Sequence, residues 1–214
     1  MTSALDELFA RCGRGELPPT DGRVEVVAPP AVGAVRAAVY SFTAHLVVAT
    51  DVAAGEVHAV APADDFGAWG GVASWLAARL GARPFSGDVL LYGVGTGGAP
   101  PLPLEDVDGY SHPRVERAAR YRDDLRVFAT PDRSGVLVLG RGVGGRHEMA
   151  FEVEPEARGR GLGRRLAACA LALAPAGEAV WAQVHPGNAA SLRALWAAGF
   201  VPVGAEVLFP RAVR

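Results

Sequence analysis

The sequence predicts an α/β protein in which helices flank a mixed β-sheet. An apolar strand pattern at 148–153 runs through a glycine-rich turn into a helical pattern at 162–174, and another apolar strand follows at 179–184. Because a helix-length crossover separates these two strands, we expect them to be parallel and buried. Strand patterns at 125–129 and 135–139 are joined by a short turn, which predicts an antiparallel hairpin in the same sheet.

The other expected elements follow in chain order. The first half holds a short amphipathic helix within 1–16, strands at 35–40 and 44–50, a helix at 66–80 and a strand at 88–92. The run Gly93-x-Gly95-x-x-Gly98 comes next, but the prolines behind it prevent a helix from starting there, so it predicts a linker and not a dinucleotide site. The second half adds a helix at 112–122, a helix that starts at Asn188 and ends before Gly199, and strands at 200–203 and 206–209.

The turn between the strand at 148–153 and its helix has the composition of an anion-binding loop. Glycines at 159, 161 and 163 remove side chains that would block the backbone, so N–H groups can converge on an anion at the positive end of the helix. Arg164 and Arg165 follow where a Walker loop needs Lys and Ser or Thr, which excludes that motif. We call this segment the anion loop; it comprises Arg158, Gly159, Arg160, Gly161, Leu162 and Gly163.

Two motifs resemble the GNAT N-acetyltransferase superfamily. Arg158-x-x-Gly161-x-Gly163 behind Val153-x-Pro155 is similar to the family's acyl-CoA signature, and the spacing from Asn188 to Gly199-Phe200 is similar to its second cofactor motif. The resemblance covers 106–209, so it implies a GNAT acyltransferase fold for a domain at 104–214 and leaves 1–103 as an accessory region.

The accessory region has features of a degenerate second copy. The offset that places Val60-Ala61-Pro62 under Val153-Glu154-Pro155 also places the helix at 66–80 under that at 162–174, which indicates a tandem GNAT-like repeat. Chance recurrence of Val-x-Pro in an Ala-, Val- and Pro-rich chain is the alternative. In such a repeat Asp65 and Phe66 replace Arg158 and Gly159, so we expect the first half to bind no CoA and to serve packing, dimer contact or shaping of the acceptor pocket.

The resemblance implies acetyl-CoA as cosubstrate, with its pyrophosphate on the anion loop. It also implies that the strand segment Phe151, Glu152 and Val153 pairs with the pantetheine arm and that Asn188 touches that arm. Asn188 also suits the N-cap of its own helix, and both roles are compatible.

An ammonium acceptor must lose a proton before it attacks, so we expect a base near the thioester. The candidates are Glu148, His147 and His185. Strand alternation places Glu148 and His147 on opposite faces, and we favour Glu148, with a solvated strand-edge carboxylate as the alternative. The family often has a tyrosine seven residues after the Asn, where this chain has Leu195, which has no proton to give to the leaving thiolate.

Composition excludes several other classes. The 214-residue chain is half apolar, with a net charge of −2 and a pI near 6.2, so we expect a globular protein that does not bind nucleic acid. We also expect no membrane segment and a cytoplasmic location. The cysteines, Cys12 and Cys169, and the five histidines show no metal-ligand spacing, so we expect no metal.

The predicted function is acetyl transfer from acetyl-CoA to the amine of a small molecule or protein, by direct attack in a ternary complex. A GNAT-like module that binds or senses acyl-CoA without catalysis is the alternative. The sequence identifies no acceptor, and a homodimer remains open.

Overall fold

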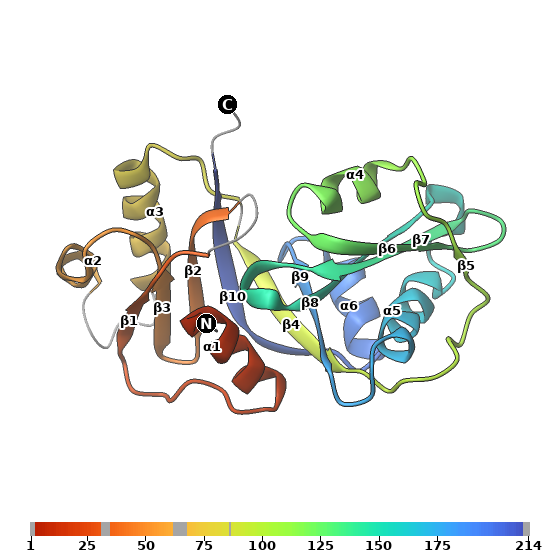
Figure 1. Cartoon of the computed structure of the whole chain (residues 1–214), viewed down its shortest axis with the longest axis horizontal. Helices are drawn as coiled ribbons and strands as arrows, with labels where there is room; N and C mark the ends of the chain where they lie inside the picture. The colour runs from red at the N-terminus through yellow and green to blue at the C-terminus, as the bar shows by residue number, and fades with distance from the viewer. Residues whose placement is uncertain (1–2, 31–34, 62–67, 86, 212–214) are drawn as a thin grey trace.

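The computed structural model describes residues 3–30, 35–61, 68–85 and 87–211, and in these a single mixed sheet of ten strands spans the molecule (Figure 1). The strand order is β1-β3-β2-β10-β4-β9-β8-β7-β6-β5, with β1 parallel to β3, β8 parallel to β9 and the other pairs antiparallel. The predicted fold class, α/β with a mixed sheet flanked by helices, is confirmed. The strands are β1 (Val24–Val27), β2 (Val35–Phe42), β3 (His45–Ala49), β4 (Asp88–Val94), β5 (Glu105–Asp106), β6 (Asp123–Ala129), β7 (Gly135–Arg141), β8 (His147–Val153), β9 (Ala179–Val184) and β10 (Val201–Pro210).

The helices begin at residues suited to cap them. Ser3 and Asp6 form a capping box on the first helix, His112 caps the fourth in front of Pro113, and Asn188 caps the last. The helices are α1 (Ala4–Gly13), α2 (Ala54–Val60), α3 (Ala68–Leu80), α4 (Pro113–Ala119), α5 (Leu162–Leu173) and α6 (Ala189–Ala197), with short 3₁₀ turns η1 (Val143–Gly145) and η2 (Pro155–Ala157).

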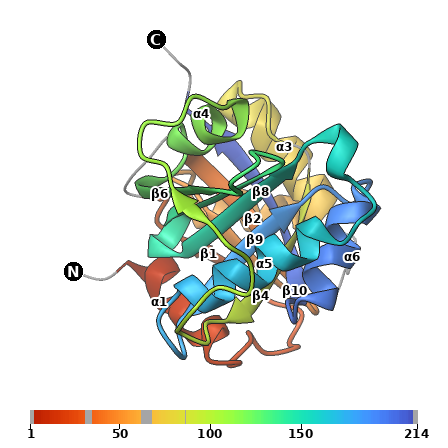
Figure 2. The same ribbon diagram turned by 90° about the vertical axis from the view of Figure 1, so that its right-hand side faces the viewer.

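Helices cover both faces of the sheet in the second half of the chain. The helices α5 and α6 lie on one face, where Leu166 and Leu195 pack against Leu137 and Met149 of the strands. The short helix α4 lies on the opposite face, where Ala118 packs against Val138, and the two views show α4 and α5 on either side of β6, β7 and β8 (Figures 1 and 2). Away from these helices, α1 and α3 pack on the strands of the first half.

The two parts expected from the sequence, 1–103 and 104–214, share this sheet. Strand β4 of the first part lies between β9 and β10 of the second, pairing Tyr92 with Trp181 and Val201. Strand β10 in turn lies between β4 and β2. The two short strands expected at 200–203 and 206–209 are one strand, whose register on β4 shifts between Pro202 and Gly204.

The offset between the two halves holds for some elements and fails at its starting point. Helix α3 and strand β4 form where it predicts them. Val60, which the offset aligns with the strand residue Val153, is the last residue of helix α2, so the two positions differ in secondary structure. Pro62, Asp65 and Phe66 lie outside the described residues, and the tandem repeat remains a prediction.

Candidate active site

The site begins where β8 and β9 separate. These parallel strands are paired at His147 with Val180 and at Glu148 with Trp181. Beyond Glu148 strand β8 stays paired with β7 as far as Val153, while β9 stays paired with β4 as far as Val184. Between the diverging strands the backbone groups of β8 that face β9 are therefore left for another partner.

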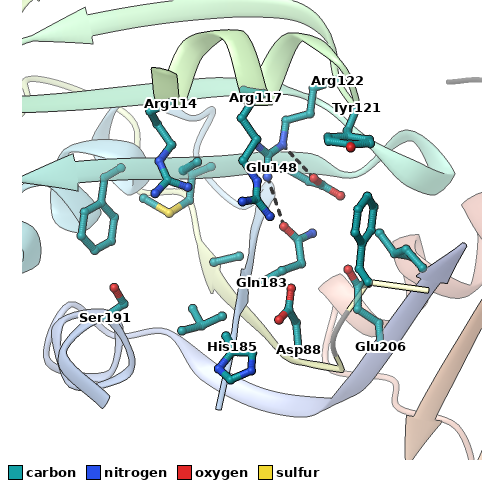
Figure 3. Close-up of a pocket in the computed structure, with 18 of the residues that line it drawn as sticks. Asp88, Arg114, Arg117, Tyr121, Arg122, Glu148, Gln183, His185, Ser191 and Glu206 are labelled. Atoms are coloured by element: carbon teal, nitrogen blue, oxygen red, sulfur yellow. Dashed lines mark hydrogen bonds and ion pairs between the residues drawn. The ribbon is translucent and has the colours of Figure 1, made fainter. Parts of the chain in front are cut away.

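A pocket of about 440 Å³ occupies this opening. Its walls come from β8, β9, α4 and α6 of the second half and from β4 and β10, so strands from both halves of the chain line it (Figure 3). Of the residues expected from the sequence, Glu148, Phe151, His185 and Asn188 line the pocket. His147, Glu152, Val153 and the six residues of the anion loop do not. The charged or titratable side chains that line it are Asp88, Arg114, Arg117, Tyr121, Arg122, Glu148, His185 and Glu206.

The anion loop has the backbone that its glycines predict. Gly159 and Gly161 have φ of 75° and 76°, in the left-handed region that favours glycine. Gly161 is the N-cap of the twelve-residue helix α5 and provides no side-chain cap, so the first N–H groups of the helix point outward without a side-chain acceptor. Arg158 donates through Nε to the carbonyl of Val153 at 3.0 Å, which fixes the loop to the end of β8.

These residues fit the acetyl-CoA that the GNAT resemblance implies. The uncapped helix end and left-handed glycines suit a pyrophosphate, and an added Cβ at Gly159 or Gly161 would meet no protein atom within 4 Å. Gly163 is close to Phe151, where a Cβ would lie 3.0 Å from the ring, so this glycine brings α5 against β8. Anion loop and strand opening thus follow one another directly along the chain.

Glu148 is a buried carboxylate held by two arginines. Only 5% of the residue is exposed, so the alternative of a solvated strand-edge group is wrong. Arg122 Nε donates to its Oε2 at 2.8 Å, and Arg146 Nη2 lies 2.7 Å from its Oε1, outside hydrogen-bond angles. Burial by itself raises the pKa of Glu148, but Arg146 and Arg122 outweigh it and the net pKa lies below the usual value.

The two histidines have different surroundings. His147 faces away from the pocket, 3.5 Å from Glu178, and burial lowers its pKa despite that carboxylate. His185 lines the pocket, and its Nδ1 accepts the N–H of Gly187 at 3.0 Å. In the neutral ring the proton therefore sits on Nε2, which makes His185 a donor toward the pocket.

Two pocket carboxylates were missed by the sequence reading. Asp88 of β4 and Glu206 of β10 are paired across neighbouring strands and share one face of the sheet. Glu206 is 2% exposed; its Oε2 accepts from Arg146 Nη1 at 2.8 Å, and its Oε1 has no hydrogen-bond partner among the described residues. Burial raises the pKa of both carboxyl groups. A charged residue inside the apolar strand 203–209 was the available signal for Glu206.

Helix α6 forms the floor of the pocket. Asn188 lines it and also caps the helix, since its Oδ1 accepts the Ser191 N–H at 3.1 Å. Leu195 is buried at the position where the GNAT resemblance leads us to expect a tyrosine. Ser191, one turn earlier, offers a hydroxyl to the same pocket (Figure 3).

Comparison with known proteins confirms the resemblance for this part of the chain. Residues 125–200 match the acetyltransferase (GNAT) family. This segment runs from β6 through β8, the anion loop and β9 to the end of α6, so it includes the strand opening. The match therefore covers the anion loop, the strand opening and α6, whereas the parts of the pocket that come from α4, β4 and β10 lie outside it.

Solved GNAT structures are similar over part of their length. An acetyltransferase from Colwellia psychrerythraea is 12% identical, over 66% of this chain and 63% of that one, with a TM-score of 0.40. One from Novosphingobium aromaticivorans is 18% identical over 63% and 69%, with a TM-score of 0.43. A GCN5-related N-acetyltransferase from Sphaerobacter thermophilus is 16% identical over 64% and 55%, with a TM-score of 0.42. No curated protein matches the chain.

Metal-ligand clusters and membrane-spanning helices are both absent from the described residues. They contain no group of three or more His, Cys, Asp or Glu side chains arranged to hold a metal ion. None of their helices has the length and apolar character needed to cross a membrane.

Proposed function

We propose that this protein transfers the acetyl group of acetyl-CoA to the amine of a small acceptor bound between α4, β4 and β10. The observation that supports this most strongly is the opening of β8 and β9 into a polar pocket next to a glycine-rich helix N-terminus. In this proposal the anion loop holds the pyrophosphate and the free backbone edge of β8 near Phe151 pairs with the pantetheine arm. When bound there, acetyl-CoA supplies an acetyl group activated as a thioester.

Glu206 is our candidate for the base. Its Oε1 has no hydrogen-bond partner in the described part of the chain, and burial keeps its pKa above the usual value, so it can accept a proton from the acceptor's ammonium. Glu148 Oε1 also lacks a hydrogen bond, but Glu148 suits this task less well, because Arg122 and Arg146 lie within 2.8 Å of its two oxygens and lower its pKa. Glu148 remains close enough to order Arg122 in the pocket wall.

Two candidate proton donors for the departing thiolate come from α6 and from the end of β9. The Ser191 hydroxyl lies on α6 one turn before Leu195, and His185 presents Nε2–H from the end of β9. A thiolate has a reference pKa of about 8.5 and leaves readily, so a weak donor is enough. The absence of tyrosine at Leu195 is thus compatible with turnover.

A thiol-release assay tests the proposed function. Purified protein is incubated with acetyl-CoA and a panel of primary amines, free CoA thiol is followed over time, and the acetylated amine is identified by mass spectrometry. We expect amine-dependent release with formation of the N-acetyl product. If no amine in the panel increases thiol release above slow hydrolysis, catalysis is excluded for those acceptors.

Leu195 has no proton to donate, and this favours a second candidate function, an acyl-CoA-binding module without catalysis. Calorimetric titration together with the thiol-release assay separates the two candidates, because the module would bind CoA at the anion loop and yet acetylate nothing. Gly161→Val would weaken binding in both cases, so turnover is the measurement that discriminates.

A further inference from the structure

Some charged side chains in the pocket are paired with other side chains of the protein, and others are not. Among the arginines of the α4 wall, Arg114 pairs with Glu152 at 3.1 Å and Arg122 pairs with Glu148 at 2.8 Å. Arg117 also lines the pocket, is exposed, and its side chain has no hydrogen bond or ion pair with any described residue. A guanidinium between two paired neighbours is thus free to meet an anion from outside the protein.

A second unpaired donor lines the same pocket. Arg122 Nη2 donates to Gln183 Oε1 at 3.1 Å, which fixes the amide so that its nitrogen points the other way. That Nε2 is buried and has no hydrogen-bond partner among the described residues. Figure 3 shows Gln183 between Arg117 above and Asp88 below. An unpaired buried donor costs free energy, so an acceptor oxygen at this position would be stabilised.

The opposite wall has acceptors without donors. Glu206 Oε1 is unpaired, and Asp88 has no ion pair with a described residue, although His185 and Arg117 are near enough to oppose the rise in its pKa. Arg117 and Asp88 therefore face each other across the pocket without contact. A ligand with one positive and one negative end would fit this arrangement, whereas a polyamine would meet the arginines of α4.

We propose that the acceptor is a small amino carboxylate such as an α-amino acid, whose ammonium lies between Asp88 and Glu206 and whose carboxylate meets Arg117 and Gln183. The inference rests on the proposed function for the identity of the donor. The volume supports a small acceptor, since about 440 Å³ has to hold the thioester end of the donor as well. The charges of the pocket define where the ammonium and the carboxylate of the acceptor bind, and they do not define the side chain of the amino acid.

The test compares each amino acid with two compounds that keep its amine. One is its primary amide, and the other is the amine that remains when the carboxylate is removed. Thiol release gives kcat/KM for each, and saturation-transfer NMR measures binding of the same compounds to the protein with and without CoA. For at least one amino acid we expect kcat/KM at least tenfold above that of its amide. In Arg117→Ala this ratio should fall at least tenfold.

Arg120→Ala is the matched control, because Arg120 is an exposed arginine at the end of the same helix that does not line the pocket. In Arg120→Ala the ratio of kcat/KM for the amino acid to kcat/KM for its amide should equal that of the wild type. Equal rates with amide and amino acid would overturn the amino-carboxylate inference and leave acetyl transfer intact. If no amine is acetylated, Arg117-dependent binding of an amino acid would still support the subsite, and absence of binding would overturn it. If the wild-type protein binds an amino acid but does not bind CoA, the proposed function is contradicted and the subsite is not.

Discussion

Arg146 gives its two glutamate partners different properties. Its guanidinium is fully buried, contacts Glu148 at 2.7 Å and Glu206 at 2.8 Å, and lies over the Phe9 ring at 4.4 Å. Glu148 has Arg122 as a second cation, whereas Glu206 has only Arg146. The carboxylate with two cations has a lowered pKa, and the one that shares a cation has a raised pKa.

Loss of the Glu148 charge should destabilise the fold. Glu148→Gln leaves Arg146 and Arg122 short of a partner, and breaking a buried ion pair costs about 3–5 kcal/mol. Because the folded pKa of Glu148 is lowered, its stabilisation is present above the unfolded value of 4.5 and is lost as pH falls through the folded pKa. Urea denaturation should therefore show the largest difference from wild type near pH 7 and a smaller one below pH 4.5.

The exposed Glu156 provides a control for that measurement. Glu156→Gln removes the same charge without a buried partner, so the free energy of unfolding should change by less than about 0.5 kcal/mol. A Glu148→Gln protein as stable as Glu156→Gln would contradict the role assigned to the Arg146 cluster.

Sequence patterns identified only some of the pocket residues. Asn188 lines the pocket as predicted, and the anion loop has the left-handed glycines that its sequence predicts, because each of these motifs is local and spans a few residues. Asp88 and Glu206 are far apart in the chain and meet because β4 pairs with β10. Such a pairing depends on tertiary structure, which periodicity in one segment does not contain. The same reason explains why Arg122 and Arg146 could not be recognised as the partners of Glu148.

At the scale of single elements, two left-handed glycines lie at the N-terminus of α5, where we propose that the pyrophosphate binds. Gly161→Val should weaken CoA binding strongly, because a β-branched residue is disfavoured at φ 76° and the rearranged turn would move the N–H groups of the helix. Calorimetric titration should show at least a tenfold higher Kd for CoA.

Gly177→Val is a suitable control at the other end of the same helix. Its φ is 84° and an added Cβ would also meet nothing within 4 Å, so backbone strain is similar. We expect its CoA affinity to match the wild type. If both variants bind CoA equally, the pyrophosphate does not bind at the anion loop.

Strand and helix patterns were accurate where alternation or a helical apolar stripe was long. The strands β6, β7, β8 and β9 and the helix α5 all form where the pattern predicts them. The Val-x-Pro pattern at 60–62 carried too little information, and α2 occupies Val60 instead. A two-residue motif cannot outweigh the surrounding helical context.

For the whole molecule, the shared sheet makes the second half dependent on the first. A chain limited to 104–214 would lack β4, which pairs with β9, and would deprive β10 of both neighbours. Exposed strand edges and lost burial should prevent a cooperative fold. Calorimetry on this fragment should show no sharp unfolding transition, and a fragment that unfolds cooperatively and binds CoA like the full chain would refute the dependence.

The number of CoA molecules bound also belongs to the whole molecule. We expect one per chain, because among the described residues one glycine-rich, uncapped helix N-terminus adjoins an opening between parallel strands. A calorimetric stoichiometry of two would show that the first half has a site of its own.

The most direct measurement is the pH dependence of amine acetylation by Glu206→Gln beside that by Glu148→Gln and the wild type. With an amine shown to be a substrate, Glu206→Gln should lower kcat/KM roughly a hundredfold or more below the amine's pKa, the range for loss of a general base. The defect should shrink as pH approaches that pKa, because the amine then loses its proton without help. A wild-type pH profile in Glu206→Gln would contradict the central claim that this pocket deprotonates an amine through Glu206.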